Sequence, residues 1–241
     1  MMTALSGRLA RAPSPSSLLG GACALGLALG VKAFYGRAGA DDLLWILAPS
    51  AWLARIFGGI DLIYEQGAGY ISHAHRLVVG PPCAGVNFLV ICFLTLYFSF
   101  ARHTGRKARW LAWTMVISFC AAVAANGLRI FVSAHLWGAD IYGGWITPER
   151  MHRLVGIVIY YASLVSLYLA VESQIAVRVS RKAPLCWYLG VSLGVPLAGR
   201  MVMGGETGFG EHAVWVASTA LLLSVLMFLA PLLRNRVCWR P

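Results

Sequence analysis

The sequence predicts an all-α, polytopic integral membrane protein that forms one domain over residues 1–241. Three observations lead to this fold class. Of the residues, 59% are hydrophobic and only 12% are charged, whereas soluble domains are nearer half apolar and a quarter charged. The mean hydropathy is +0.71. Several apolar runs approach or exceed the ~20 residues that a transmembrane helix needs.

Six apolar runs predict membrane-spanning helices. In chain order they are Leu18–Tyr35, Ala84–Ala101, Trp110–Leu136, Leu154–Val171, Pro184–Met203 and Ala213–Leu233. The first run follows two arginines, as the apolar part of a signal peptide does. It is long, however, and cleavage-site features are weak before Lys32, so we expect a retained first helix.

The stretch Asp41–Ile63 differs from these runs, because it is apolar but contains Pro49, Arg55 and a pair of glycines. A charge near the middle of a lipid-facing helix costs about 2.5–3.5 kcal/mol on insertion scales. We therefore expect a re-entrant or interfacial helix. The following segment, Tyr64–Pro82, has a glycine turn between short β-compatible runs, which predicts a small extracytoplasmic hairpin.

Basic residues between the apolar runs predict the orientation. If the spans alternate, three clusters fall on one side, which should be the cytoplasm. They are Arg102–Arg109, then Arg178, Arg181 and Lys182, then Arg234, Arg236 and Arg240. The N-terminal arginines join them only if Asp41–Ile63 does not cross. The net charge of +11 is thus explained by membrane orientation, and no nucleic-acid partner is expected.

Cys83 is the first candidate for chemistry, in the stretch RLVVGPPCAGVNF. The six cysteines show neither C-x-x-C nor zinc spacing, and Cys83 alone is predicted at the outer surface. Prolines suit a helix start, so Pro81 and Pro82 predict that Cys83 lies in the first turn of the second span. Helix N-termini favour a reactive thiolate. Cys83 is therefore either a nucleophile or a small residue packed at a crowded helix start.

Arg129 and His152 are the other two candidates. Arg129 lies inside an apolar span near its outer end, where an ionisable group indicates a functional site unless it reaches the interface as a snorkelling side chain. Asn126 shares its helix face and is expected to orient the guanidinium. His152 begins the next span at the same depth, either as a general base or as a surface histidine. A thiolate, a proton carrier and a fixed cation are the groups that acyl transfer needs.

Three segments, PPCAGVNFL, NGLRI and MHRLVGIVIYY, resemble the exosortase/archaeosortase family in order and setting, and the similarity is strongest over residues 43–168. The resemblance implies a cysteine protease-transpeptidase in the bacterial cytoplasmic (inner) membrane, with its active site on the extracytoplasmic face and no cofactor. Cys83 would form a thioester, Arg129 would stabilise the oxyanion or the substrate, and His152 would relay the proton.

The resemblance also implies the partners. The substrate would be a membrane-anchored protein with a C-terminal sorting signal, made of a short motif, a transmembrane helix and a basic tail. The acceptor would be an amine or hydroxyl on a glycan or lipid, or water. Family members often have Ser-Gly-Ile or Ser-Gly-Leu after the cysteine, whereas this chain has Ala-Gly-Val. This departure suggests a divergent subtype, for which exosortase K is the candidate.

Two other classes of protein stay open. In a non-catalytic transporter or assembly scaffold, Arg129 would bind an anionic solute or stabilise packing, and Cys83 would have no chemical role. A membrane redox protein is disfavoured because a dithiol is expected there. Zinc proteases, serine hydrolases and nucleotide enzymes are disfavoured by the lack of their motifs.

Overall fold

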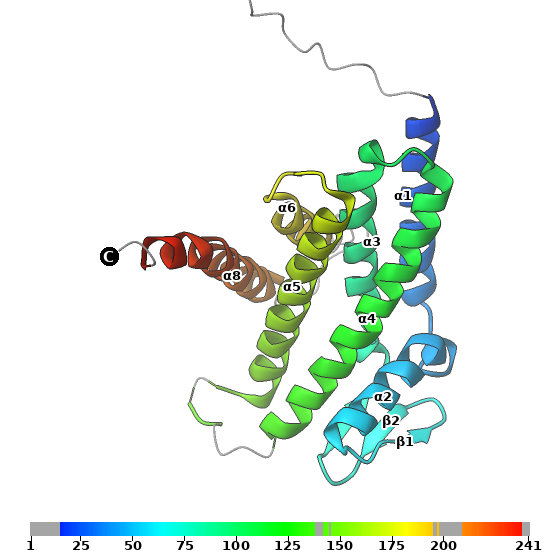
Figure 1. Cartoon of the computed structure of the whole chain (residues 1–241). Helices are drawn as coiled ribbons and strands as arrows, with labels where there is room; N and C mark the ends of the chain where they lie inside the picture. The colour runs from blue at the N-terminus through cyan, green and yellow to red at the C-terminus, as the bar shows by residue number, and fades with distance from the viewer. Residues whose placement is uncertain (1–14, 138–141, 145, 195–196, 198–208, 238–241) are drawn as a thin grey trace, which may run out of the picture.

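The computed structural model describes residues 15–137, 142–144, 146–194, 197 and 209–237. Within these ranges the chain forms seven α-helices (Figure 1): α1 (Pro15–Tyr35), α2 (Leu44–Gly58), α3 (Val86–Phe100), α4 (Lys107–Trp137), α5 (Pro148–Ile175), α6 (Ala183–Leu189) and α8 (Phe209–Val237).

Four of the described helices, α1, α3, α4 and α5, are long and apolar enough to cross a membrane once the flanking turns of α3 are included. They coincide with the first four predicted spans. Ala183–Gly194 and Ala213–Leu226 are shorter apolar helical segments. The predicted span Pro184–Met203 is helical through a π-helical turn that ends at Gly194, and most of its remainder lies outside the described residues. The structure thus supports a membrane protein with four long spans.

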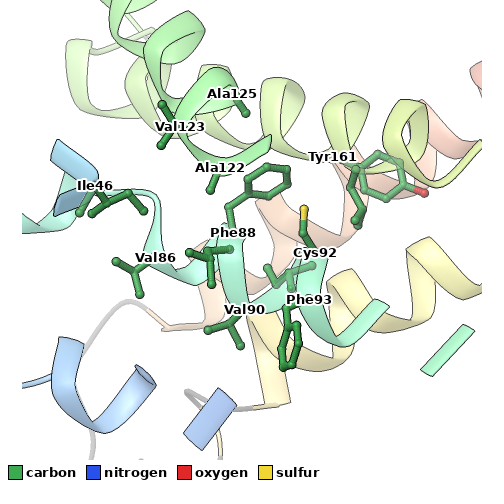
Figure 2. Packing of buried hydrophobic residues seen from close by; sticks show 14 of the residues in the cluster. Ile46, Val86, Phe88, Val90, Cys92, Phe93, Ala122, Val123, Ala125 and Tyr161 are labelled. Atoms are coloured by element: carbon green, nitrogen blue, oxygen red, sulfur yellow. The ribbon is translucent and has the colours of Figure 1, made fainter. Parts of the chain in front are cut away.

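Helix α3 lies at the centre of the fold. Its sequence is apolar on every face, a pattern that requires burial among other helices or in lipid. Of its apolar window, 78% is buried within the protein, against 11% for α1. Figure 2 shows Phe88 and Cys92 from α3 on the side of Ala122 from α4 and Tyr161 from α5, and all four belong to one buried cluster. Because α3 is held on several sides, its N-terminal end is a fixed support for the turn that carries Cys83.

Helix α2 occupies the stretch that the sequence sets apart from the spans. Its 15 residues extend about 22 Å, short of the ~30 Å hydrocarbon core. It packs against α4, where Trp45 stacks on Phe119 at 5.9 Å between ring centroids. The helix ends at Gly58, and the next residue, Gly59, adopts a left-handed conformation with φ +62°. Its interfacial position stays a prediction.

The segment before α3 forms a three-stranded antiparallel sheet, so the predicted hairpin has a third strand, while the fold as a whole is mostly helical. The order is β1 (Ile63–Glu65), β2 (Gly69–Ser72) and β3 (Leu77–Val79). Strand β3 buries Leu77 and Val79 and exposes Val78. This alternation is too short to stand out in the sequence, and β3 is recognisable only through its pairing with β2.

Asp41, just before α2, ties the sheet to the helices. Its carboxylate accepts hydrogen bonds from the Tyr64 hydroxyl at 2.6 Å and from the Gly67 amide at 2.8 Å. The Tyr64 bond first, and then the Gly67 bond, lower the pKa of Asp41 below its ordinary value. In Figure 1, α2 and the sheet lie at the end of the bundle where α4 finishes and α5 begins, opposite the α3–α4 connection.

Candidate active site

The structure brings the three predicted residues together at this end of the bundle. Cys83 Sγ lies 3.7 Å from His152 Nε2, although the two residues are 69 positions apart. Arg129 Nη2 lies 2.7 Å from the same nitrogen. Cys83 comes from the turn before α3, Arg129 from α4 and His152 from the first turns of α5. One cluster therefore holds a thiol, an imidazole and a guanidinium.

Cys83 sits in a separate 3-10 turn, η2 (Pro81–Cys83), so its predicted place in the first turn of α3 is wrong. The Cys83 amide donates to the Gly80 carbonyl at 2.9 Å. Gly85 then adopts a left-handed conformation, with φ +76°, and α3 begins only at Val86. The left-handed residue interrupts the helix, so the helix-dipole argument for Cys83 does not apply. What surrounds the thiol is set by other helices instead.

Two helices hold the turn by its carbonyl groups. Asn126 Nδ2 on α4 donates to the Cys83 carbonyl at 2.7 Å. The Tyr35 hydroxyl on α1 donates to the Pro81 carbonyl at 3.0 Å. Gly85 is required here for a second reason, because a Cβ added to it would lie 3.3 Å from Asn126 Cβ. Asn126 was expected to orient Arg129, but its side chain fixes the backbone of Cys83 instead.

Tyr160 on α5 links Asn126 to Arg129. Its hydroxyl donates to Asn126 Oδ1 at 2.9 Å and accepts from Arg129 Nη1 at 3.2 Å. Its ring stacks on Phe88 of α3, with 4.7 Å between centroids and 10° between planes. Arg129 Nε is buried and has no hydrogen-bond partner within the described part of the chain. The guanidinium is therefore oriented by α5, through Tyr160 and His152.

The hydrogen bonds of His152 determine its tautomer. A guanidinium can only donate, so Nε2 accepts from Arg129 and carries a lone pair rather than a proton. Nδ1 then carries the proton and donates to Ser133 Oγ at 3.3 Å. His152 is accordingly neutral in this arrangement. The lone pair on Nε2 faces Cys83 and Arg129 together.

Three supporting residues were not identified from the sequence: Ser133, Tyr160 and Tyr35. Ser133 follows Arg129 by four residues and Tyr160 follows His152 by eight, so each shares a helix face with a predicted site residue. This helical spacing is a signal in the sequence from which Ser133 and Tyr160 could have been predicted as site residues. Tyr35 gives no such signal, since its place beside Pro81 depends on how α1 packs against the rest of the bundle.

Comparisons of the chain with protein-family models, with curated proteins and with solved structures gave no match. The fold defines a helical membrane protein, and the site defines a half-buried Cys–His–Arg cluster at one end of its long helices.

Proposed function

We propose that the protein is an exosortase-like membrane cysteine protease-transpeptidase, which cleaves the C-terminal sorting signals of exported proteins through a Cys83 thioester. One observation carries the proposal: Cys83 Sγ lies 3.7 Å from the unprotonated Nε2 of His152, and a guanidinium lies beside the same nitrogen. A nucleophile within reach of an oriented base, with a cation nearby, is the arrangement that covalent acyl transfer requires.

In the first step, His152 Nε2 takes the proton of Cys83, and the sulfur attacks the scissile carbonyl carbon. The carbonyl oxygen becomes an oxyanion, to which Arg129 donates a hydrogen bond. His152 keeps its other proton on Nδ1, and the hydrogen bond from Nδ1 to Ser133 Oγ holds the ring plane during the transfer. Fixed donors of this kind typically contribute about 10²–10³ to kcat.

In the second step, the carbon–nitrogen bond breaks and the leaving amine takes the proton from His152 Nε2. The acyl group is then a thioester on Cys83. An acceptor amine or hydroxyl loses its proton to the same nitrogen and attacks the thioester, which releases the thiol. Water in this role would give simple hydrolysis.

The substrate class and the membrane setting follow from the motif resemblance. A substrate with a short motif, a transmembrane helix and a basic tail would place its motif just outside the bilayer. The Cys83 cluster lies toward the end of the bundle where α4 ends and α5 begins, and this end would lie at that depth. In the orientation given by the basic loops, this end faces the extracytoplasmic side of the bacterial inner membrane. The residues after Cys83 favour a divergent subtype such as exosortase K.

Co-expression with an exported protein that carries such a C-terminal signal tests the proposal. We expect Cys83→Ala to abolish the size change of the substrate, whereas Cys120→Ala, which alters an exposed cysteine on α4, should leave it intact. His152→Ala should slow processing about 10²–10⁴-fold, the usual contribution of a general base. Unchanged processing by Cys83→Ala would exclude the thioester and leave a transporter or scaffold role in its place.

Labelling of intact cells with a membrane-impermeant thiol reagent tests the orientation. Cys83 should react from the outside, and the Cys83→Ala variant should lose that label. If Cys83 is reached only after the cytoplasm is opened, the active site faces the wrong side for an exported substrate.

A further inference from the structure

A cavity of about 420 Å³ lies between the long helices and reaches Arg129. Its volume falls within the ~300–1,000 Å³ range of small-molecule sites. Helices α1, α3 and α5 form its walls, and Tyr188, Val191 and Val216 close its far side. The chemistry proposed above uses only Arg129 and Tyr160 of this lining.

The cavity is polar at one end and apolar at the other. At the polar end, Lys32 of α1 donates to Asn87 Oδ1 of α3 at 2.5 Å. Two leucines line the cavity deeper along the same helices: Leu25 is seven residues from Lys32 on α1, and Leu94 is seven residues from Asn87 on α3. Each interval is about 10 Å at 1.5 Å per residue. The two helices are antiparallel across the site, so both intervals run toward the membrane interior. The shape suits an amphiphile whose chain points into the bilayer.

The polar end is positively charged. Lys32, Arg129 and Arg153 line it, and no Asp or Glu is among the described lining residues. Glu149, one turn before Arg153 on α5, is not part of the lining. Asn87 accepts from Lys32 through its oxygen, so its NH₂ group remains as a further donor. Guanidinium and ammonium groups that line one cavity are suited to a phosphate.

We propose that this cavity binds an anionic phospholipid, with its phosphate held by Lys32 and Arg153 and one acyl chain between α1 and α3. Basic pockets between transmembrane helices recognise anionic headgroups in this way. The apolar depth below the charges favours a lipid over a soluble anion, because a free phosphate would leave that part of the cavity without a ligand. The site goes beyond the proposed function and does not depend on the reactivity of Cys83.

Native mass spectrometry of the purified protein in detergent tests the site, with dioleoyl-phosphatidylglycerol and dioleoyl-phosphatidylcholine as probes. We expect selective retention of phosphatidylglycerol. Lys32→Gln and Arg153→Gln should each weaken its binding about fivefold, and the double variant about 25-fold. Arg37→Gln is the matched control, because Arg37 is an exposed cation beyond the end of α1 that does not line the cavity.

Leu29→Trp tests the chain-binding part. Leu29 lines the cavity but its side chain is 68% exposed, so the substitution leaves the protein core intact. It should weaken phosphatidylglycerol binding and leave any binding of inorganic phosphate unchanged.

Three results would overturn the inference: equal retention of both lipids, an equal effect of Arg37→Gln, or phosphate binding that the lipid does not displace. The same titration on Cys83→Ala should match the unmodified protein. A failure of lipid binding is therefore distinguishable from a failure of proteolysis.

Discussion

Replacement of Asn126 by Ala removes the side chain that joins the backbone of Cys83 to Tyr160, the hydrogen-bond partner of Arg129. Asn126 is fully buried. Its two hydrogen bonds, to the Cys83 carbonyl at 2.7 Å and from the Tyr160 hydroxyl at 2.9 Å, connect three different elements of the chain. We expect Asn126→Ala to lower the free energy of unfolding and to slow substrate processing together.

The magnitude follows from these two bonds. Interhelical hydrogen bonds in membrane proteins average about 0.6 kcal/mol and reach about 1.7 kcal/mol. Two lost bonds therefore predict a destabilisation of about 1–3 kcal/mol. Since the Cys83 carbonyl and the Tyr160 hydroxyl are both left without this partner, the upper half of the range is expected. A double-mutant cycle with Tyr160→Phe should give a coupling of about 0.6–1.7 kcal/mol, because both single changes break the same bond.

Equilibrium unfolding in mixed micelles measures the stability, and the co-expression assay measures processing. Ser118→Ala is the matched control on α4, since Ser118 Oγ is buried and has no hydrogen-bond partner among the described residues. It should cost little or stabilise slightly. If Asn126→Ala is as stable as Ser118→Ala and processes substrate at the unmodified rate, the role assigned to Asn126 is refuted.

Two further predictions concern Arg129 and the sheet. A Cβ at Gly156 would lie 3.0 Å from Arg129 Nε. Gly156→Ala should therefore displace the guanidinium and slow processing at least ~10-fold, because small misplacements in a site have effects of this size. An unchanged rate would show that Arg129 can shift freely. The pKa of Asp41 is lowered in the folded protein, so its hydrogen bonds stabilise the fold at pH values above the pKa of Asp41 in the unfolded chain, ~3.9. This stabilisation is lost as the pH falls through the pKa of Asp41 in the folded protein. Amide exchange at Gly67, corrected for intrinsic rates, should lose protection only as the pH falls through the lowered pKa of folded Asp41, below ~3.9, and Asp41→Asn should remove this pH dependence.

The long helices and the identity of the site residues are predictable from the sequence. Hydropathy over some twenty residues is a local property, and it locates α1, α3, α4 and α5 without knowledge of the packing. The ends of these helices place Cys83, Arg129 and His152 at one depth. Alternation of spans is enough to predict their proximity, although it gives neither distances nor hydrogen-bond partners.

What the sequence does not predict depends on contacts between elements. Pro81 and Pro82 are compatible with both a helix start and a separate turn, and the left-handed Gly85 beside Asn126 decides between them. Asn126 has two neighbours that it could hold, Arg129 on its own helix and Cys83 on another. Packing selects Cys83, because Tyr160 occupies the remaining side of the amide and supports Arg129 itself.

The single lone pair on His152 Nε2 has a consequence for the resting protein. Two donors, the thiol of Cys83 and the guanidinium of Arg129, compete for it, and the shorter contact belongs to Arg129. In the proposed mechanism, His152 cannot take the proton of Cys83 while the guanidinium holds Nε2, so the base is not available to the thiol. A bound carbonyl would offer Arg129 a different acceptor and so free the base. Substrate binding itself would then complete the activation of Cys83.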